Sequence, residues 1–258
     1  MAKIYTIISG KGGVGKTTTA INLAASMNYL GENVIIIDAN LTTPNVGIHL
    51  GAPIVPITLN HVLNNQTKFE EAIYQHESGT KVMPASLSLR ETEKINYNKL
   101  PELTKKIKKI ADYIFIDSAA GLGEEAKAAI DSCDEIIIVT NPEMSAVTDA
   151  LKTIKLSEER GKDIVGVILT RYKGKSYEMS IPNIRDMLEI PILGIIPEDD
   201  AIRESQAIKN AVVHTHPRSK SAKNYFNISK KLLGKKYDSI NLNKTNIIER
   251  FLQSIGLK

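Results

Sequence analysis

One short stretch constrains the fold of this chain more than any other: the glycine-rich segment GKGGVGKTTT at residues 10–19. It follows the apolar run Ile4–Ile8, which has the length and composition of a buried strand, and a helical pattern over Thr17–Tyr29 comes after it. Backbone N–H groups of such a loop, together with the N-terminus of the next helix, attract phosphate oxygens. The segment therefore predicts a nucleotide site at the end of the first strand.

The residue types within this loop predict separate roles in nucleotide binding. The spacing Gly10-x-x-x-x-Gly15-Lys16-Thr17 places a lysine at the β- and γ-phosphates and a threonine hydroxyl at Mg²⁺. The other loop residues expected to contact the nucleotide are Gly12, Gly13, Val14, Gly15 and Thr18. Lys11 is a second lysine, which this pattern does not require.

Further apolar runs predict the rest of the sheet. They lie at Val34–Ile37, Tyr113–Ile116, Ile136–Thr140, Val165–Leu169 and Ile192–Ile196. Because they are apolar throughout, we expect strands covered by helices on both faces. Helical patterns lie at Leu100–Ile110, Glu124–Asp131, Ala146–Arg160 and Ile181–Leu188. This alternation predicts an α/β fold, a doubly wound, mostly parallel sheet flanked by helices, with its ligand at the C-terminal ends of the strands.

One strand ends in the carboxylate that a phosphate-binding loop needs for Mg²⁺. The run YIFID ends at Asp117, and the segment SAAGLGEE after it has the glycines of a loop that shifts with the γ-phosphate. We therefore expect Asp117 beside the cation. The alternative is that Asp117 only caps the end of its strand.

Length and composition favour one cytoplasmic domain with an appended tail. The 258 residues suit a single α/β core, no apolar run approaches the roughly 18 residues of a membrane span, and the N-terminus lacks signal-peptide features. We expect the nucleotide-binding domain at residues 1–233, a linker at 234–245 and an amphipathic helix at 246–258. The single cysteine, Cys133, makes neither an internal disulfide nor a CxxC motif, so we expect a small buried residue.

The C-terminus differs in charge and pattern from the rest of the chain. Residues 218–258 contain ten Lys or Arg and two acidic residues. Within the last 13 residues, one apolar stripe of a helix is formed by Ile247, Ile248, Phe251, Leu252 and Ile255. Such a helix beside basic residues is typical of reversible binding to an anionic membrane surface. The alternative is a last helix that packs on its own domain.

With these motifs the chain resembles the MinD/ParA family of ATPases, whose deviant Walker A motif KGGVGKT stands here at Lys11–Thr17. Resemblance is closest to the MinD branch, through the segments ISGKGGVGKTTTAINLA, DSAAGLGEEA, TNPEMSAV, LTRY and IPED, which together extend from residue 4 to about residue 200. The resemblance implies ATP as nucleotide and an ATP-dependent homodimer. It also implies that Lys16 acts on its own subunit's phosphates, whereas Lys11 reaches the partner subunit's.

The loop after the second strand departs from the family pattern. Relatives have D-x-D, whose first acid lies near Mg²⁺ and whose second orients the attacking water; here the segment is Asp38-Ala39-Asn40. An amide accepts a hydrogen bond from water but cannot take its proton. We therefore expect slow ATP hydrolysis, with Asp38 as a second Mg²⁺-side carboxylate. The alternative is that Asn40 merely turns the chain.

The resemblance implies further site residues. Loops that surround the adenine in the family match Thr170, Arg171, Pro197, Glu198 and Asp199, and the guanine-reading NKxD pattern is absent. Asp149 matches an acid that holds the extra lysine at rest, with a solvated helix residue as the alternative.

Three functions follow. The first is a MinD-like switch ATPase that dimerises with ATP and binds the cytoplasmic membrane peripherally. It positions a partner for cell division or for a polar structure. Its activating protein is not identified by the sequence. The second is a ParA-like DNA-partition ATPase, which the amphipathic tail disfavours, and the third is an FlhG-type flagellar placement ATPase. An iron–sulfur carrier would need bridging cysteines that Cys133 alone does not supply.

Overall fold

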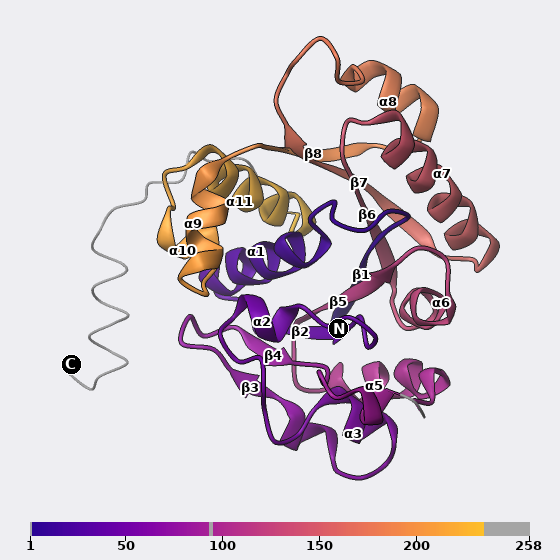
Figure 1. The fold of residues 1–258 in the computed structure, drawn as a ribbon, viewed down its shortest axis with the longest axis vertical. Coiled ribbons are helices and arrows are strands. Elements are labelled where there is room, and N and C mark those ends of the chain that lie inside the picture. The colour runs from indigo at the N-terminus through magenta and orange to yellow at the C-terminus, as the bar shows by residue number, and fades with distance from the viewer. Residues whose placement is uncertain (1, 93–94, 235–258) are drawn as a thin grey trace.

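A computed structural model describes residues 2–92 and 95–234 (Figure 1). Its sheet has the strand order β3-β4-β2-β5-β1-β6-β7-β8, and every pairing is parallel except that of β3 with β4. The strands are β1 Lys3–Ser9, β2 Val34–Ala39, β3 Tyr74–Gln75, β4 Lys81–Met83, β5 Tyr113–Ala120, β6 Glu135–Thr140, β7 Asp163–Tyr172 and β8 Ile192–Pro197. The predicted doubly wound, mostly parallel sheet is confirmed.

Helices cover both faces of this sheet, as Figure 1 shows. One layer contains α1 Lys16–Tyr29, α2 Val46–His49, α10 Val212–Thr215 and α11 Lys220–Leu232, with α9 Asp200–Ala207 beside it. The other contains α3 Leu59–Leu63, α5 Leu100–Ile107, α6 Glu124–Asp131, α7 Met144–Glu159 and α8 Ile181–Leu188. The short α4 Leu89–Thr92 and two 3₁₀ helices, Phe69–Ala72 and Tyr97–Lys99, complete the described elements.

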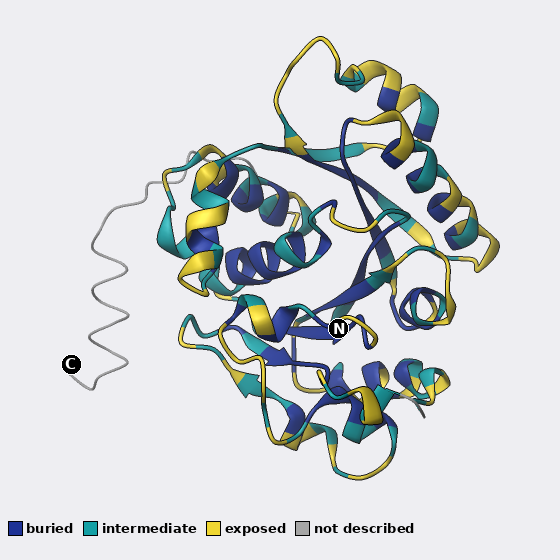
Figure 2. Ribbon diagram, in the orientation of Figure 1, coloured by how far each residue is buried: buried dark blue, intermediate teal, exposed yellow. Residues whose placement is uncertain are grey.

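Two apolar cores explain why the strands are apolar throughout. Along β1, Tyr5 and Ile7 pack toward α1 and α11, whereas Ile4 and Ile8 pack toward α6 and α7. Successive side chains of a strand point to opposite faces, so each strand supplies both cores. Figure 2 shows the buried sheet between exposed outer helix surfaces. This double coverage fixes the C-terminal strand ends as the open edge where a ligand can bind.

The predicted elements agree with the structure in place and type, but several boundaries differ and other elements were not predicted. Helix α5 ends at Ile107 rather than Ile110, and β5 extends to Ala120 rather than Ile116. The elements that were not predicted are β3, β4, α2, α3, α4, α9, α10, α11 and both 3₁₀ helices. A strand of two or three residues has too few positions to display a period. Among the described helices, none has the length and apolar character of a membrane span. The domain of residues 1–233 stays a prediction; the predicted linker (234–245) beyond Gly234 and the helix at 246–258 lie outside the described residues.

Candidate nucleotide site

The glycine-rich loop connects β1 to α1 and leaves space for a phosphate. Gly13 and Gly15 have φ values of 76° and 94°, a left-handed conformation that side chains other than glycine rarely adopt. Gly15 is the N-cap of α1, and its carbonyl accepts the N–H of Thr19 at 2.9 Å. A Cβ on Gly12 or Gly13 would find nothing within 4 Å. The loop therefore turns its backbone around open space at a helix N-terminus, where anions bind favourably.

Asp117 lies in the buried part of β5 and faces the first turn of α1. The Thr17 hydroxyl donates to Asp117 Oδ2 at 2.6 Å, while Asp117 Oδ1 is buried without a hydrogen-bond partner among the described residues. Burial raises the pKa of Asp117 to about 6, although the Thr17 hydrogen bond and the Lys16 charge act in the opposite direction. A threonine hydroxyl beside an unpartnered carboxylate oxygen is a donor set that fits Mg²⁺.

Asp38 lies beside Asp117, because β2 and β5 pair with these two residues in register. Its side chain is fully buried and accepts backbone N–H groups from Asn40, Asn45 and Val46 at 3.2, 3.0 and 2.9 Å. Burial and the nearby Asp117 charge raise the pKa of Asp38 well above its ordinary value. Two adjacent buried carboxylates favour a divalent cation.

Protein side chains alone do not complete a metal site here. The described residues contain no group of three or more His, Cys, Asp or Glu that could hold a metal. Magnesium requires six oxygen ligands and usually takes several from water and substrate phosphates. Thr17, Asp38 and Asp117 therefore fit a cation that binds together with the nucleotide.

Lys16 points its charge into the same site. Only 8% of Lys16 is exposed. Burial lowers the pKa of its ammonium group; the Asp117 charge acts in the opposite direction but more weakly, so this pKa lies below its ordinary value. A cavity of about 340 Å³ opens above the loop; it is lined by Gly12, Gly13, Gly15, Lys16, Thr17, Thr18, Asn40, Thr43, Asn45, His49, Ala120, Arg171 and Gln206. A buried lysine beside such a cavity can form charged hydrogen bonds with phosphate.

A second cavity, of about 180 Å³, continues from the first. The two share Gly15, Thr18, Arg171 and Gln206, and the second also brings together Thr170, Pro197, Glu198 and Asp199. The five residues predicted around the adenine thus lie on one side of the loop. Sequence reasoning missed Gln206, whose Nε2 donates to Thr18 Oγ1 at 2.8 Å, and Tyr225, because neither is near a motif.

Two of these residues also have structural contacts. The Thr170 hydroxyl lies 2.5 Å from the Val14 carbonyl oxygen, so it ties β7 to the loop. Asp199 is the N-cap of α9, through Ala201 N–H at 3.1 Å, and it accepts the Ser221 hydroxyl at 2.9 Å. Burial raises the pKa of Asp199, but the hydrogen bonds from Ser221 and Ala201 outweigh it and leave that pKa below its ordinary value.

Lys11 rests against a different acid from the one expected. Its Nζ lies 3.2 Å from Glu143 Oε2 and 3.2 Å from Ser145 Oγ, whereas the Asp149 carboxylate pairs with Lys152 at 3.1 Å. The prediction that Asp149 holds Lys11 is wrong for this conformation. The backbone of Asp149 lies against the loop instead, because a Cβ added to Gly10 would collide with the Asp149 carbonyl oxygen. Lys11 remains 42% exposed and open to a partner.

Asn40 is occupied by its own loop. Its Nδ2 donates to the Thr43 carbonyl at 2.5 Å, and its Oδ1 accepts the Thr43 hydroxyl at 3.0 Å. These contacts agree with a residue that turns the chain, but the amide keeps a second N–H and a second lone pair, so the role of Asn40 toward a water stays a prediction.

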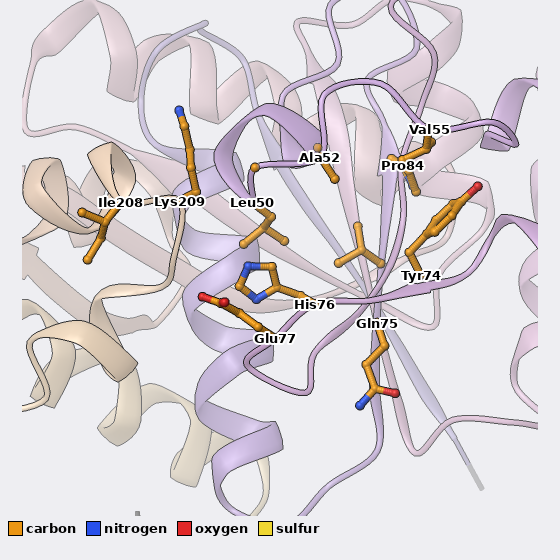
Figure 3. A pocket seen from close by; sticks show the side chains of 13 residues that line it. Leu50, Ala52, Val55, Tyr74, Gln75, His76, Glu77, Pro84, Ile208 and Lys209 are labelled. Carbon is orange, nitrogen blue, oxygen red and sulfur yellow. The ribbon is translucent and has the colours of Figure 1, made fainter. Parts of the chain in front are cut away.

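A larger cavity, of about 480 Å³, contains none of the predicted site residues. Leu50, Ala52, Tyr74 and Pro84 line it, with Ile208 from the segment after α9 at its side (Figure 3). Its walls are mainly apolar. Its lining includes Gly47, Gly51 and Glu77, but none of the glycine-rich loop residues and neither of the buried carboxylates Asp38 and Asp117.

Comparisons with known proteins agree with this geometry. A family model described as ParA, NUBPL iron-transfer P-loop NTPase, matches residues 1–233. An uncharacterized ATP-binding protein of Methanocaldococcus jannaschii is 36% identical over 256 residues, which are 99% of this chain and 97% of that protein.

Solved structures show the same fold in septum-site proteins. The septum site-determining protein MinD of Pyrococcus horikoshii, complexed with Mg-ADP, has a TM-score of 0.86 and 36% identity, and the match covers 90% of this chain and 96% of that chain. The MinC:MinD cell division complex of Aquifex aeolicus has a TM-score of 0.83 and 29% identity, with 94% of this chain and 99% of that chain covered.

Proposed function

This chain belongs to the ParA family of P-loop NTPases, and on that premise we propose that it is a MinD-like switch ATPase that dimerises when it binds ATP. The observation that carries the proposal is the pair of adjoining cavities that extends from the glycine-rich loop to Arg171 and Glu198. The same loop carries a second lysine, Lys11, whose side chain is 42% exposed. The cavity accommodates phosphates at one end and a base at the other. Solved relatives of this chain include MinD with Mg-ADP.

The proposed reaction is slow hydrolysis of ATP. Lys16 would bind the β- and γ-phosphates, and Thr17, Asp38 and Asp117 would hold Mg²⁺. Such a cation would supply positive charge beside the phosphate oxygens. Slow turnover is expected because the amide of Asn40 is engaged by Thr43 and cannot accept a proton.

Lys11 supports the dimer in this proposal. Its ion pair with Glu143 is exposed, and such pairs are worth at most about 1 kcal/mol, so a second copy can displace it. Three exposed apolar residues lie in segments that follow the C-terminal ends of strands: Leu122, Met144 and Tyr177. Apolar side chains beside a movable cation suit closure of two nucleotide-bound subunits over their phosphates.

Membrane attachment is proposed to depend on that dimer. One amphipathic helix binds a bilayer marginally, whereas two tails on one dimer bind with avidity. In this account the ATP-bound protein is cytoplasmic and peripherally attached to the membrane, where it positions a partner protein. The septum-site and cell-division names of its relatives favour a cell-division role over other positioning roles.

Iron transfer, which the family description mentions, is not proposed for this chain. Its single cysteine, Cys133, is buried, and its thiol donates to the Ile130 carbonyl at 3.2 Å. Burial raises the pKa of that thiol, and a metal ligand must be a thiolate.

Co-sedimentation tests the proposal. The full chain is pelleted with anionic liposomes or with duplex DNA, each with ADP and with ATP; we expect pelleting with liposomes and ATP only. The same chain without Asn246–Lys258 is the control and should remain in the supernatant with an unchanged Tm. Unchanged pelleting together with a lower Tm would show that the tail packs on the domain. Pelleting with DNA but not with lipid would favour the partition ATPase.

A further inference from the structure

Another cavity, distinct from those described above, adjoins the phosphate side of the site. It has a volume of about 410 Å³ and shares Asn40, Thr43 and Ala120 with the cavity above the glycine-rich loop. Its walls come from the loop after β2 and from the segment that follows β5 into α6. These two segments follow the strands that carry the buried carboxylates Asp38 and Asp117, so the cavity adjoins the phosphate side of the site.

One carboxylate of this cavity is fixed at one oxygen and free at the other. Glu125, in the first turn of α6, accepts the Thr42 hydroxyl and, at 3.3 Å, the Tyr97 hydroxyl through Oε1. Its Oε2 is buried and has no hydrogen-bond partner in the part of the chain that the structure describes. A buried acceptor without a partner is costly, which indicates that a polar group such as water belongs there.

The other polar side chains of the cavity do not fit that role. Asn40 is engaged at both amide atoms by Thr43. Glu124 is exposed, and its carboxylate pairs with Lys127 at 2.8 Å. Glu125 lies in the first turn of α6, and its contact with Thr42 links it to the loop that carries Asn40.

We propose that Glu125 supplies the carboxylate that position 40 lacks, by holding and deprotonating the water that attacks the γ-phosphate. The inference rests on the proposed ATPase function. The water oxygen forms a bond to the γ-phosphorus, and the bond from that phosphorus to the β–γ bridging oxygen breaks. The bridging oxygen keeps the electron pair on ADP. One water proton moves to Glu125 and later to solvent, leaving hydrogen phosphate.

Steady-state hydrolysis by Glu125→Gln tests this role. Glutamine keeps the oxygen that accepts from Thr42 and Tyr97 but cannot take a proton. We expect kcat to fall about 100-fold, the usual size of a general-base effect, with KM and Tm close to those of the wild type. Glu124→Gln is the matched control and should retain kcat within about twofold. Adding Asn40→Asp to Glu125→Gln should restore most of the lost kcat.

Each other outcome contradicts a definite part of the proposal. If Glu125→Gln hydrolyses ATP within about threefold of an active wild type, Glu125 does not act on the water. The same holds if Glu124→Gln loses as much activity, or if kcat falls only together with Tm. If the wild type hydrolyses no ATP with or without liposomes, the ATPase proposal fails and this inference fails with it.

Discussion

The phosphate side and the base side of the nucleotide cavity are built in different ways. On the phosphate side, Lys16, Asp38 and Asp117 are buried; Lys16 begins α1, and the two carboxylates lie in the C-terminal halves of β2 and β5. On the base side, Arg171 is exposed, and Gln206 reaches Thr18 across 188 positions of the chain. The charges that bind phosphate therefore come from short local motifs, whereas the shape of the base side depends on packing between distant helices.

Removing the buried lysine should have the largest effect on nucleotide binding. Lys16→Ala deletes the charged hydrogen bonds to phosphate in a buried site, so we expect affinity for Mg-ATP to fall at least about 100-fold, or about 2.7 kcal/mol. Isothermal titration calorimetry measures this. A loss of less than about tenfold would mean that the backbone of the loop, rather than Lys16, carries the affinity.

Replacing the Mg²⁺-side carboxylate should separate binding from stability. Asp117→Asn should weaken Mg²⁺-dependent nucleotide affinity about tenfold, because a charged ligand is lost. The nucleotide-free variant should nevertheless be more stable than the wild type near pH 7.5, by about 2 kcal/mol.

The sign of this effect follows from the raised pKa of Asp117. That pKa is about 6 in the folded protein, above the value of about 3.9 in an unfolded chain. Protonated Asp117 therefore stabilises the fold below about pH 4, and this stability is lost as the pH rises through 6. Urea unfolding at pH 4 and pH 7.5 measures the difference between variant and wild type. An equal difference at both values would contradict the assignment.

On the base side, we expect one acid to matter for folding more than for binding. Asp199→Ala removes the N-cap of α9 and the hydrogen bonds from Ser221, so the free energy of unfolding should fall by about 1–2 kcal/mol. Nucleotide affinity should change by less than about threefold. Glu198→Ala is the control, because its partner Arg203 is largely exposed and the loss of their ion pair should change stability by at most about 1 kcal/mol. A large loss of affinity in Asp199→Ala would show that this residue contacts the base.

The smallest effect on binding is expected from the other lysine of the same loop. Lys11→Ala removes an exposed ion pair to Glu143, so the monomer should bind Mg-ATP within about twofold of the wild type. Hydrolysis that depends on protein concentration should be lost, because the proposed partner-side cation is gone. Calorimetry and ATPase assays at several protein concentrations check both results. Unchanged concentration dependence would contradict the dimer role.

The sequence alone determined the sheet core and the phosphate side. Apolar runs on both strand faces predicted the double helical cover, because a strand buried on both sides is mostly apolar on both. The loop pattern brought Lys16 and Thr17 to one place, and the strand ends added Asp38 and Asp117. Both arrangements depend on neighbours within a few residues, or on the rule that parallel strands end at one edge.

Only the tertiary structure decided which groups fill the remaining contacts. Three contacts join segments far apart in sequence. Lys11 pairs with Glu143 instead of Asp149, Gln206 donates a hydrogen bond to Thr18, and Glu125 accepts from Thr42 and Tyr97. The contact of the Asn40 amide with Thr43 is likewise visible only in the tertiary structure. Side-chain partners depend on how whole helices pack against the sheet, within a few tenths of an ångström, and no local pattern of residue types encodes that spacing.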